Sequence, residues 1–264
     1  LIGKAVRLDI QTASGLPRLW HGHVTGFALL ASNGGFARYR LRIEPWLAFL
    51  RSRQDSFLFQ EQSVIDIADS LFADYQGSAQ AAWRWALADR AVYPKRGTTT
   101  QFRESDFAFL SRLLAEEGLY YWFEHQAADG DELGQHTLVL ADTVTAHKPG
   151  AQTHIAFQRA DVTEPHDTLQ RWHEQVKLQT SCLVRSSWDY RSVDPRPLQA
   201  TALHLGNGVQ PLVWTDDSGA YSWATRAQGE RLLANAAQAL TARARTWQAQ
   251  STVRTLAPAS TFVL

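Results

Sequence analysis

The chain has 264 residues, and its 26 basic and 26 acidic side chains balance to a net charge of zero at pH 7. No overall field therefore attracts nucleic acid or an anionic membrane surface, and we expect neither as a partner. Hydrophobic residues make up 45% of the chain and ten residues are tryptophan, which predicts a folded protein with an aromatic-rich interior or interface. At this length we expect two or more domains.

Cysteine content, apolar runs and methionine content predict the cellular compartment, the absence of a membrane anchor and whether the sequence is part of a longer protein. Cys182 is the only cysteine, which excludes an internal disulfide and a cysteine-based zinc site and favours a reducing compartment. No apolar run reaches the roughly 18 residues of a membrane span, and residues 1–10 lack the basic head and long apolar body of a signal peptide. We therefore expect no membrane anchor. The chain has no methionine, so we expect it to be a piece of a longer protein.

The first 50 residues have the pattern of antiparallel strands. Polar and apolar residues alternate over 5–12, and a longer strand is expected over 19–30. A glycine-rich turn at 32–35 leads into a third strand whose polar face carries Arg38, Arg40 and Arg42. We interpret these arginines as solvated, with a tube wall or subunit contact as the alternative hypothesis. Pro45 then suits the first turn of a short helix, Trp46–Arg51.

A second helix is expected to begin at Ser63, because Asp66 stands three residues later as in a capping box. Its apolar side chains recur at helical spacing, and Gly77 is the predicted end. The apolar positions are Val64, Ile67, Ala68, Leu71, Phe72 and Tyr75. A surface loop is expected over 77–82, and the pattern over 83–88 does not decide between helix and strand.

The stretch 92–125 predicts a strand, a helix and a second strand in close succession. Residues 98–102 are β-branched and aromatic, Ser105 suits a helix N-cap, and Gly118 suits the left-handed residue that ends a helix. The expected apolar stripe is Phe107, Leu110, Leu113 and Leu114. Residues 119–123 are five large apolar residues in a row, so we expect a strand covered on both faces, in a hairpin with 136–140.

The last third of the chain combines strands with one long helix. Pro149 and Gly150 are interpreted as a boundary, and strands are expected over 169–178, 181–190 and 209–214. Residues 222–247 predict a helix of about seven turns, followed by an extended segment over 252–264. The apolar stripe of this expected helix is Leu233, Ala236, Ala237, Leu240, Ala244 and Trp247.

Two blocks of this sequence resemble a known family. Residues 101–125, QFRESDFAFLSRLLAEEGLYYWFEH, are similar to a signature of VgrG, the spike protein of bacterial type VI secretion systems. Residues 32–75 resemble a second block of that family, and HTLVLAD at 136–142 follows in family order. The resemblance implies an α+β, β-rich fold like a phage tail hub, with two tube-type antiparallel β-barrel domains and an inserted α+β domain. It places these domains at 1–50 (N-terminally incomplete), 51–158 and 159–264, the last with the long helix.

The same resemblance implies a structural function. The chain would be part of a homotrimeric hub that adapts the sixfold Hcp tube to a threefold needle and helps deliver effector proteins. It would assemble in the cytoplasm and then be secreted. A prophage contractile-tail baseplate hub is the alternative within the same class. The family's opening strands would lie upstream of Leu1, and its OB-fold and needle would begin near the point where this sequence stops.

Few residues suggest chemistry. His21 and His23 point the same way on a probable strand, as a metal pair requires, but no third ligand is identifiable and we expect a solvent-facing pair. His166 and His173 are interpreted in the same way. The pair Glu116 and Glu117 is expected at a solvated helix end, because adjacent helical residues diverge. The pair Asp216 and Asp217 is expected in a turn.

Cys182 is expected to be a small buried hydrophobe rather than a nucleophile. The tryptophans leave one further function open, a carbohydrate-binding module, since aromatic faces can bind sugars. We expect core or subunit-interface anchors instead. The tryptophans expected to be such anchors are Trp46, Trp122, Trp172 and Trp188. No motif of a hydrolase, nucleotide-binding loop or zinc protease occurs, so we assign no catalytic, metal-binding or cofactor-binding residue and expect no cofactor and no enzyme activity.

Overall fold

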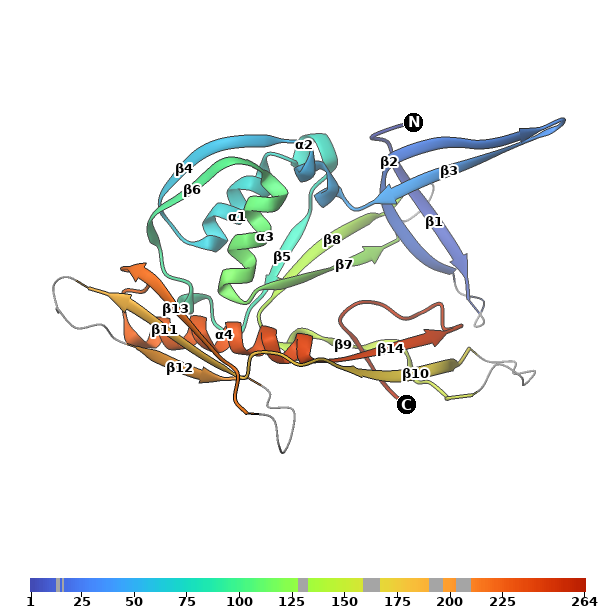
Figure 1. Cartoon of the computed structure of the whole chain (residues 1–264). Coiled ribbons are helices and arrows are strands. Elements are labelled where there is room, and N and C mark those ends of the chain that lie inside the picture. Colours follow the sequence, from blue (N-terminus) through green and yellow to red (C-terminus); the bar gives the residue numbers. More distant parts are fainter. Residues whose placement is uncertain (13–14, 16, 128–132, 159–166, 190–196, 203–209) are drawn as a thin grey trace.

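The computed structural model describes residues 1–12, 15, 17–127, 133–158, 167–189, 197–202 and 210–264. Three regions follow one another along the chain (Figure 1): an N-terminal sheet, a central body with most of the helices, and a C-terminal region built on one long helix. The N-terminal sheet, in the order β1-β2-β3, comprises β1 (Ala5–Gln11), β2 (Pro17–Asn33) and β3 (Phe36–Glu44).

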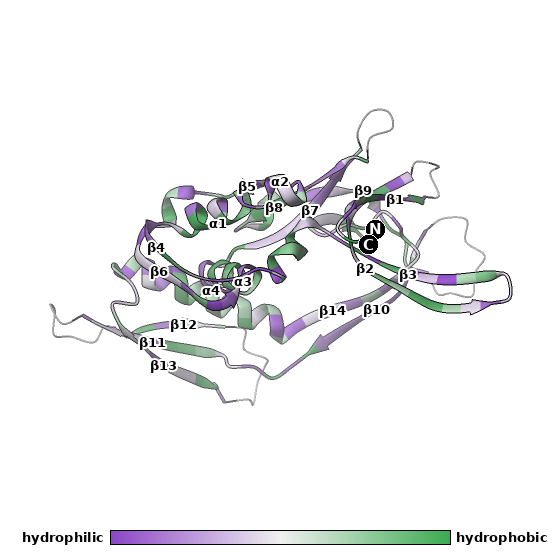
Figure 2. Cartoon of the chain, turned by 90° about the horizontal axis from the view of Figure 1, so that it is seen from above, coloured by the Kyte–Doolittle hydropathy of each residue, from purple (hydrophilic) through white to green (hydrophobic). Residues whose placement is uncertain are grey.

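The β2–β3 hairpin is much longer than the strand β1 that pairs with it, so its outer half projects from the molecule (Figures 1 and 2). Apolar side chains on both faces of this half are exposed, among them Phe27, Leu29, Phe36 and Tyr39. Such a ribbon buries little of its own apolar surface in a single chain, which is unusual for a soluble protein.

The central body holds the largest hydrophobic core. Its elements are η1 (Trp46–Arg51), β4 (Gln54–Gln62), α1 (Val64–Ala73), α2 (Gln76–Ala79), β5 (Trp83–Ala86), η2 (Arg90–Val92), β6 (Arg96–Ser105), α3 (Asp106–Glu117), β7 (Tyr120–Gln126), β8 (Gln135–Ala141) and η3 (Val144–Ala146). Strand β4 pairs with β6, and a separate sheet has the order β5-β8-β7. Helices α1 and α3 pack between these sheets around Trp46, Phe72 and Phe109, which are fully buried.

Local sequence signals place the central helices where we expected them. The Ser63 hydroxyl accepts the Asp66 N–H and the Asp66 carboxylate accepts the Ser63 N–H, which confirms the capping box. Ser105 caps α3, and Gly118 ends it with a φ of +74°. The prediction that α1 extends to Gly77 is wrong, because α1 ends at Ala73 and Gly77 lies within the separate short helix α2.

Two strand predictions in the central body need correction. The hairpin of β7 with β8 is confirmed as an antiparallel pair, but β7 is not covered on both faces, since Tyr121 is exposed. Trp122, on the other face, is buried, and so is Leu119 just before the strand. The undecided segment after Ala82 is strand β5, which lies parallel to β8.

The C-terminal region contains β9 (Lys148–His154), β10 (Leu169–Val176), β11 (Cys182–Trp188), β12 (Leu198–Thr201), β13 (Val213–Ala220), α4 (Arg226–Ala244), β14 (Arg245–Ser251) and β15 (Ser260–Val263). Helix α4 packs on the sheet β12-β11-β13 through Leu233 and Ala237, and it also contacts α3. Strands β10 and β14 form a two-stranded ribbon, and β15 pairs with β9.

Several predictions fail in this region because strand pairing overrides local sequence. Pro149 and Gly150 are not a break in the structure, since they lie within β9. Asp216 and Asp217 lie within β13, not in a turn. The long helix spans 226–244 rather than 222–247, so Trp247 belongs to β14 and not to the apolar stripe.

The fold is β-rich α+β, as expected, but the two tube-type barrels are not found. Among the described residues every sheet has two or three strands, and none closes on itself. The expected all-antiparallel second barrel is also contradicted locally, because β11 and β13 run parallel, as do β15 and β9.

Candidate functional site

The two signature blocks meet at a buried carboxylate, Asp106, in the first turn of α3. Its side chain is fully buried and accepts hydrogen bonds from the Tyr75 hydroxyl at 2.7 Å and from Gln101 Nε2 at 2.8 Å. Arg53 lies 3.5 Å away and also pairs with Asp74. Burial and the bond to Asp106 raise the pKa of Tyr75, so Tyr75 remains a donor. The network ties β4, β6 and the end of α1 to α3, a structural role.

A second buried carboxylate, Glu117, joins the central body to the long helix. It is 3% exposed and pairs with Arg96 of β6 at 2.6 Å and with Arg231 of α4. The Asn235 side chain donates to the Glu117 carbonyl at 2.9 Å. The expectation of a solvated helix end is therefore wrong for Glu117, while Glu116 is half exposed and pairs with Arg96. Arginines hold both Glu116 and Glu117, so these two carboxylates are not arranged for acid–base chemistry.

The expected solvent-facing pair His21 and His23 is buried instead, at 3% and 2% exposure. Strand β2 carries both side chains against β7 and β8, where His125 and His136 meet them. The ring centroids of His21 and His136 lie 5.0 Å apart, and those of His23 and His136 lie 6.0 Å apart. The rings of His125 and His136 are 5.9 Å apart. We call these four residues the histidine cluster.

Hydrogen bonds determine the tautomers in the histidine cluster. The Trp46 N–H donates to His136 Nε2 at 2.8 Å, so this nitrogen carries no proton and neutral His136 is protonated on Nδ1. His136 Nδ1 lies 2.7 Å from His21 Nδ1 and donates to it, which leaves the proton of His21 on Nε2. His21 Nε2 is buried and has no hydrogen-bond partner, and both ring nitrogens of His23 share that condition. The backbone N–H of His21 donates to His125 Nδ1 at 3.1 Å.

This arrangement does not suit a metal ion. A neutral histidine ligand offers one nitrogen to the metal and donates from the other, but His136 Nε2 faces an N–H donor and cannot donate. The Nδ1 atoms of His21 and His136 are also closer than two ligands on one metal usually are. Within the part of the chain that the structure describes, no group of three or more His, Cys, Asp or Glu side chains is placed to hold a metal.

Burial keeps His21, His125 and His136 uncharged. Burial, reinforced by the charges of His21, His125 and His23, lowers the pKa of His136 to about 3. Burial and the nearby Arg18 lower the pKa of His125 to about 4. Burial also lowers the pKa of His21. These histidines are therefore neutral at pH 7.

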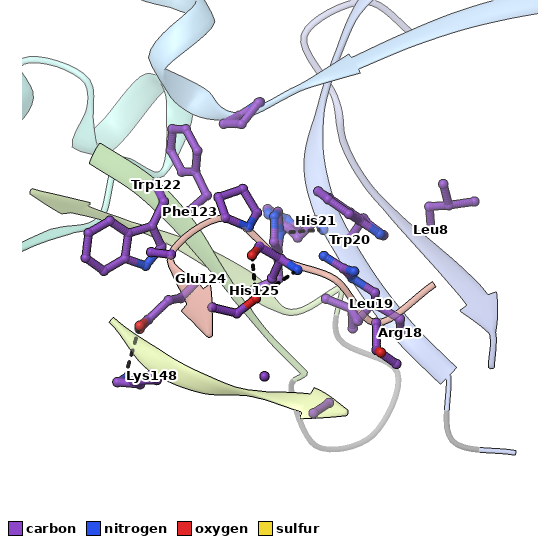
Figure 3. A pocket seen from close by; sticks show the side chains of 18 of the residues that line it. Leu8, Arg18, Leu19, Trp20, His21, Trp122, Phe123, Glu124, His125 and Lys148 are labelled. Atoms are coloured by element: carbon purple, nitrogen blue, oxygen red, sulfur yellow. Dashed lines mark hydrogen bonds and ion pairs between the residues drawn. The ribbon is translucent and has the colours of Figure 1, made fainter. Parts of the chain in front are cut away.

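A cavity of about 1500 Å³ lies beside the histidine cluster, between β2, β7, β9 and the segment before β15. Figure 3 shows Trp20, His21 and His125 on one side of it and Trp122 and the Glu124–Lys148 ion pair on the other. Arg18 closes one end by donating to the carbonyls of Arg254 and Leu256. Its walls are largely aromatic and aliphatic. Of the charged side chains in its lining, Arg18 binds backbone carbonyls, Glu44 pairs with Arg51, and Glu124 pairs with Lys148.

The remaining candidates do not form a site. Cys182 is half-buried and accepts a hydrogen bond from Gln199 at 3.2 Å, so the prediction of a buried hydrophobe is wrong. His173 is exposed on β10 beside Gln248, and His166 lies outside the described residues. No helix in the described ranges is both long and apolar enough to cross a bilayer.

The tryptophans divide between two environments. Trp46 and Trp122 are buried, at 0% and 6% exposure, as expected of core anchors. Trp172 and Trp188 are 41% and 48% exposed, on β10 and β11, where only an interface with another molecule would bury them. Arg38, Arg40 and Arg42 are exposed along one face of β3.

The histidine cluster could not be found from sequence because β2, which carries His21 and His23, lies more than 100 residues before His125 and His136. One local signal was present. Gly22 stands between His21 and His23, and a Cβ there would lie 2.8 Å from Ile43 Cγ2 and 2.9 Å from the Glu44 carbonyl oxygen. A glycine within a strand marks close approach on its own face of the sheet, which is the face opposite to His21 and His23, so this signal indicates crowding at β2 without locating the histidines.

Comparison with known families and proteins agrees with the sequence resemblance. The family model described as "Phage tail baseplate hub (GPD)" matches residues 1–264. Type VI secretion system spike protein VgrG1b of Pseudomonas aeruginosa is 30% identical to this chain over 199 residues, 72% of the chain and 25% of the relative. The chain thus spans about a quarter of the length of this curated relative.

Two solved structures are similar in fold. The tail protein from Neisseria meningitidis MC58 matches 92% of this chain and 69% of its own, with a TM-score of 0.57 at 14% identity. The 43 kDa tail protein of prophage MuSo2 from Shewanella oneidensis matches 92% of this chain and 72% of its own, with a TM-score of 0.52 at 13% identity. At these identities the likeness concerns the fold alone.

Proposed function

We propose, from the premise that this chain belongs to the phage tail baseplate hub family, that it is the hub portion of a type VI secretion spike. The family is structural rather than enzymatic. The observation that carries the finer proposal is the similarity to VgrG1b over 72% of the chain. In this proposal three copies form a hub that joins a sixfold Hcp tube to a threefold needle and helps carry effector proteins. The hub assembles in the cytoplasm and is then secreted.

The exposed ribbons support a role in assembly. The outer half of β2–β3 exposes large apolar side chains, including Phe36 at 89%, and the β10–β14 pair exposes Trp172, Val176 and Trp247 on one face. A two-stranded ribbon has no core of its own, so burial of these side chains requires a neighbouring subunit or another module. We propose that both ribbons contribute to tube walls in the assembled parent protein. The domains at 1–50, 51–158 and 159–264 remain part of this proposal.

The test uses the full-length parent protein that carries this chain. Native mass spectrometry is expected to give a trimer, and immobilised trimer is expected to retain purified Hcp. A monomer under these conditions would contradict the proposal.

The arginine face of β3 gives a sharper variant of the same test. Arg38→Glu with Arg40→Glu reverses two charges on this face, and Arg226→Glu with Arg243→Glu makes the same change at exposed positions on α4. The first pair should weaken trimer formation or Hcp capture, and the second should leave both unchanged. Equal behaviour of the two double variants would remove the arginine face from the proposal.

A prophage contractile-tail hub is the second candidate function. The observation in its favour is that the two solved tail proteins cover 92% of this chain. The two candidates differ in the tube protein that they bind. Capture of a phage tail-tube protein in place of Hcp, by the same immobilised trimer, would support the prophage hub.

A further inference from the structure

The N-terminal sheet is joined to the rest of the molecule mainly through the histidine cluster. Strand β2 contacts β7, β8 and η1, and two of its links there are the bond from the His21 N–H to His125 and the bond between the rings of His136 and His21. The Trp46 N–H fixes the His136 ring within the central body. His23 packs edge-on against Phe49 of η1 at 5.2 Å between ring centroids. Arg18 adds two bonds to the segment before β15.

We propose that the histidine cluster is an acid-sensitive joint, which holds the β1–β3 sheet against the central body at neutral pH and releases it in acid. The joint uses neutral rings both as donors and as acceptors. Protonation would place two donors opposite each other between His21 and His136, and a second positive charge would lie one ring away. Release of β2 separates His21 and His23 from His125 and His136 and frees the bonded His21 Nδ1, His125 Nδ1 and His136 Nδ1, while His136 Nε2 keeps its Trp46 donor.

The charged groups on the packed elements do not offset such protonation. They include Arg7 and Asp9 on β1, Arg18 on β2, Glu44 on β3, Arg51 on η1, Glu124 on β7 and Lys148 on β9. Asp9 pairs with Arg7, the Glu44 carboxylate is held by Thr25 and Arg51, and Glu124 by Arg84 and Lys148. The cations oppose charge on the cluster, and the three carboxylates are already engaged. A histidinium formed in the docked state would therefore have no free counter-ion among the groups named.

The sign of the pH effect follows from linkage. Docking lowers the pKa of His125 to about 4 and of His136 to about 3 from an ordinary value of 6.5, so the released state binds more protons. The cluster's contribution to docking is complete above pH 6.5 and declines as the pH falls toward 4. Between pH 7 and pH 5 His125, which loses its His21 donor on release, shifts the equilibrium toward release by roughly 20-fold.

Hydrogen exchange on the full-length parent protein measures this release. Protection of the β2 amides near His21 and His23, corrected for the pH dependence of intrinsic exchange, is expected to fall by roughly 20-fold or more between pH 7 and pH 5. The amides of α3 are expected to keep their protection over the same range. A fall of less than tenfold at β2, or an equal loss of protection at α3, would overturn the proposal.

The double variant His125→Asn/His136→Gln keeps two hydrogen-bond acceptors and removes the two imidazoles that titrate. Gln at 136 places an amide oxygen near the Nε2 position that accepts the Trp46 N–H, and Asn at 125 places one near the Nδ1 position. In His125→Asn/His136→Gln the pH effect at β2 should shrink below tenfold, whereas His173→Gln, on the exposed strand β10, should leave it intact. An undiminished pH effect in the double variant would overturn the proposal.

A direct titration covers the case in which the double variant does not fold. Carbon-13 NMR of the imidazole Cε1 positions in the unaltered protein should show that His125 and His136 stay neutral as long as the β2 amides are protected, and gain protons only as that protection is lost. Titration of both near pH 6.5 in the folded protein would overturn the proposal. None of these measurements depends on trimer formation or Hcp binding, so failure here leaves the proposed function untouched.

Discussion

Replacement of Asp106 by alanine should destabilise α3 locally by about 3 to 5 kcal/mol. Asp106 is fully buried and accepts one bond from Tyr75 and one from Gln101. A hydrogen bond to a charged group contributes about 1.5 to 3 kcal/mol, and loss of the acceptor leaves both donors buried without a partner. Loss of a carboxylate in the first helical turn adds about 0.3 to 1 kcal/mol.

The assay is native-state hydrogen exchange at the α3 amides, which gives a local opening free energy even when other modules are present. Asp74→Ala is the matched control, because Asp74 pairs with the same Arg53 but is 52% exposed, and it should cost less than about 1 kcal/mol. Asp106→Asn should cost less than Asp106→Ala, since the Tyr75 hydroxyl can accept and the Gln101 amide can rotate.

A double-mutant cycle separates the bond itself from general disruption. Tyr75→Phe combined with Asp106→Ala should reveal a coupling energy of about 1 to 2 kcal/mol between the two side chains. The reasoning would be refuted if Asp106→Ala cost no more than Asp74→Ala, or if the cycle gave a coupling near zero. Either result would mean that the signature aspartate is not what holds the start of α3.

Three further substitutions test other parts of the structure. Trp122→Ala should lower stability by about 3 to 5 kcal/mol, because the side chain is 6% exposed in its cluster, and a nearly unchanged melting temperature would favour a sugar-binding surface instead. Gly22→Ala should cost about 1 to 3 kcal/mol and raise exchange in β2 and β3, since its Cβ meets a backbone carbonyl; unchanged exchange would contradict this contact. Glu117→Ala should lower the free energy of unfolding by about 2 to 3 kcal/mol, a value reduced because Arg96 and Arg231 are about a quarter exposed to solvent. An equal effect of Glu116→Ala would argue against the buried pairing.

Sequence predicted best those elements whose signals are local. Helix α3 begins at Ser105 and ends at Gly118 as expected, because capping and left-handed termination depend on neighbouring residues. The end of α4 has no such signal. Residues from Arg245 onward would continue a helical pattern, but they pair with β10 as β14 instead. The short strand β12 and the unalternating strand β4 were not predicted, because their partners lie far away in the chain.

The candidate sites were least predictable because they depend on long-range contacts. Glu117 looks like a solvated helix end until Arg231 of α4 is placed beside it. His21 and His23 look like a surface pair until β8 supplies His136. The four-residue capping box at Ser63, in contrast, was predicted from sequence alone and is confirmed. When a buried polar cluster is assembled from distant strands, the sequence of each strand alone gives little indication of it.

The bonds from Arg18 to the carbonyls of Arg254 and Leu256, and from Arg254 to the Gln11 carbonyl, bring together segments more than 230 residues apart. During synthesis on the ribosome, Gln11 and Arg18 are made long before residues 254–256, so these hydrogen bonds cannot form until nearly the whole chain between them has been synthesised. Contacts of such sequence separation form late and slowly. Newly made chains should therefore pass through a stage in which the central body is ordered and the first hairpin is still undocked, a window in which a chaperone or a sister chain can reach it.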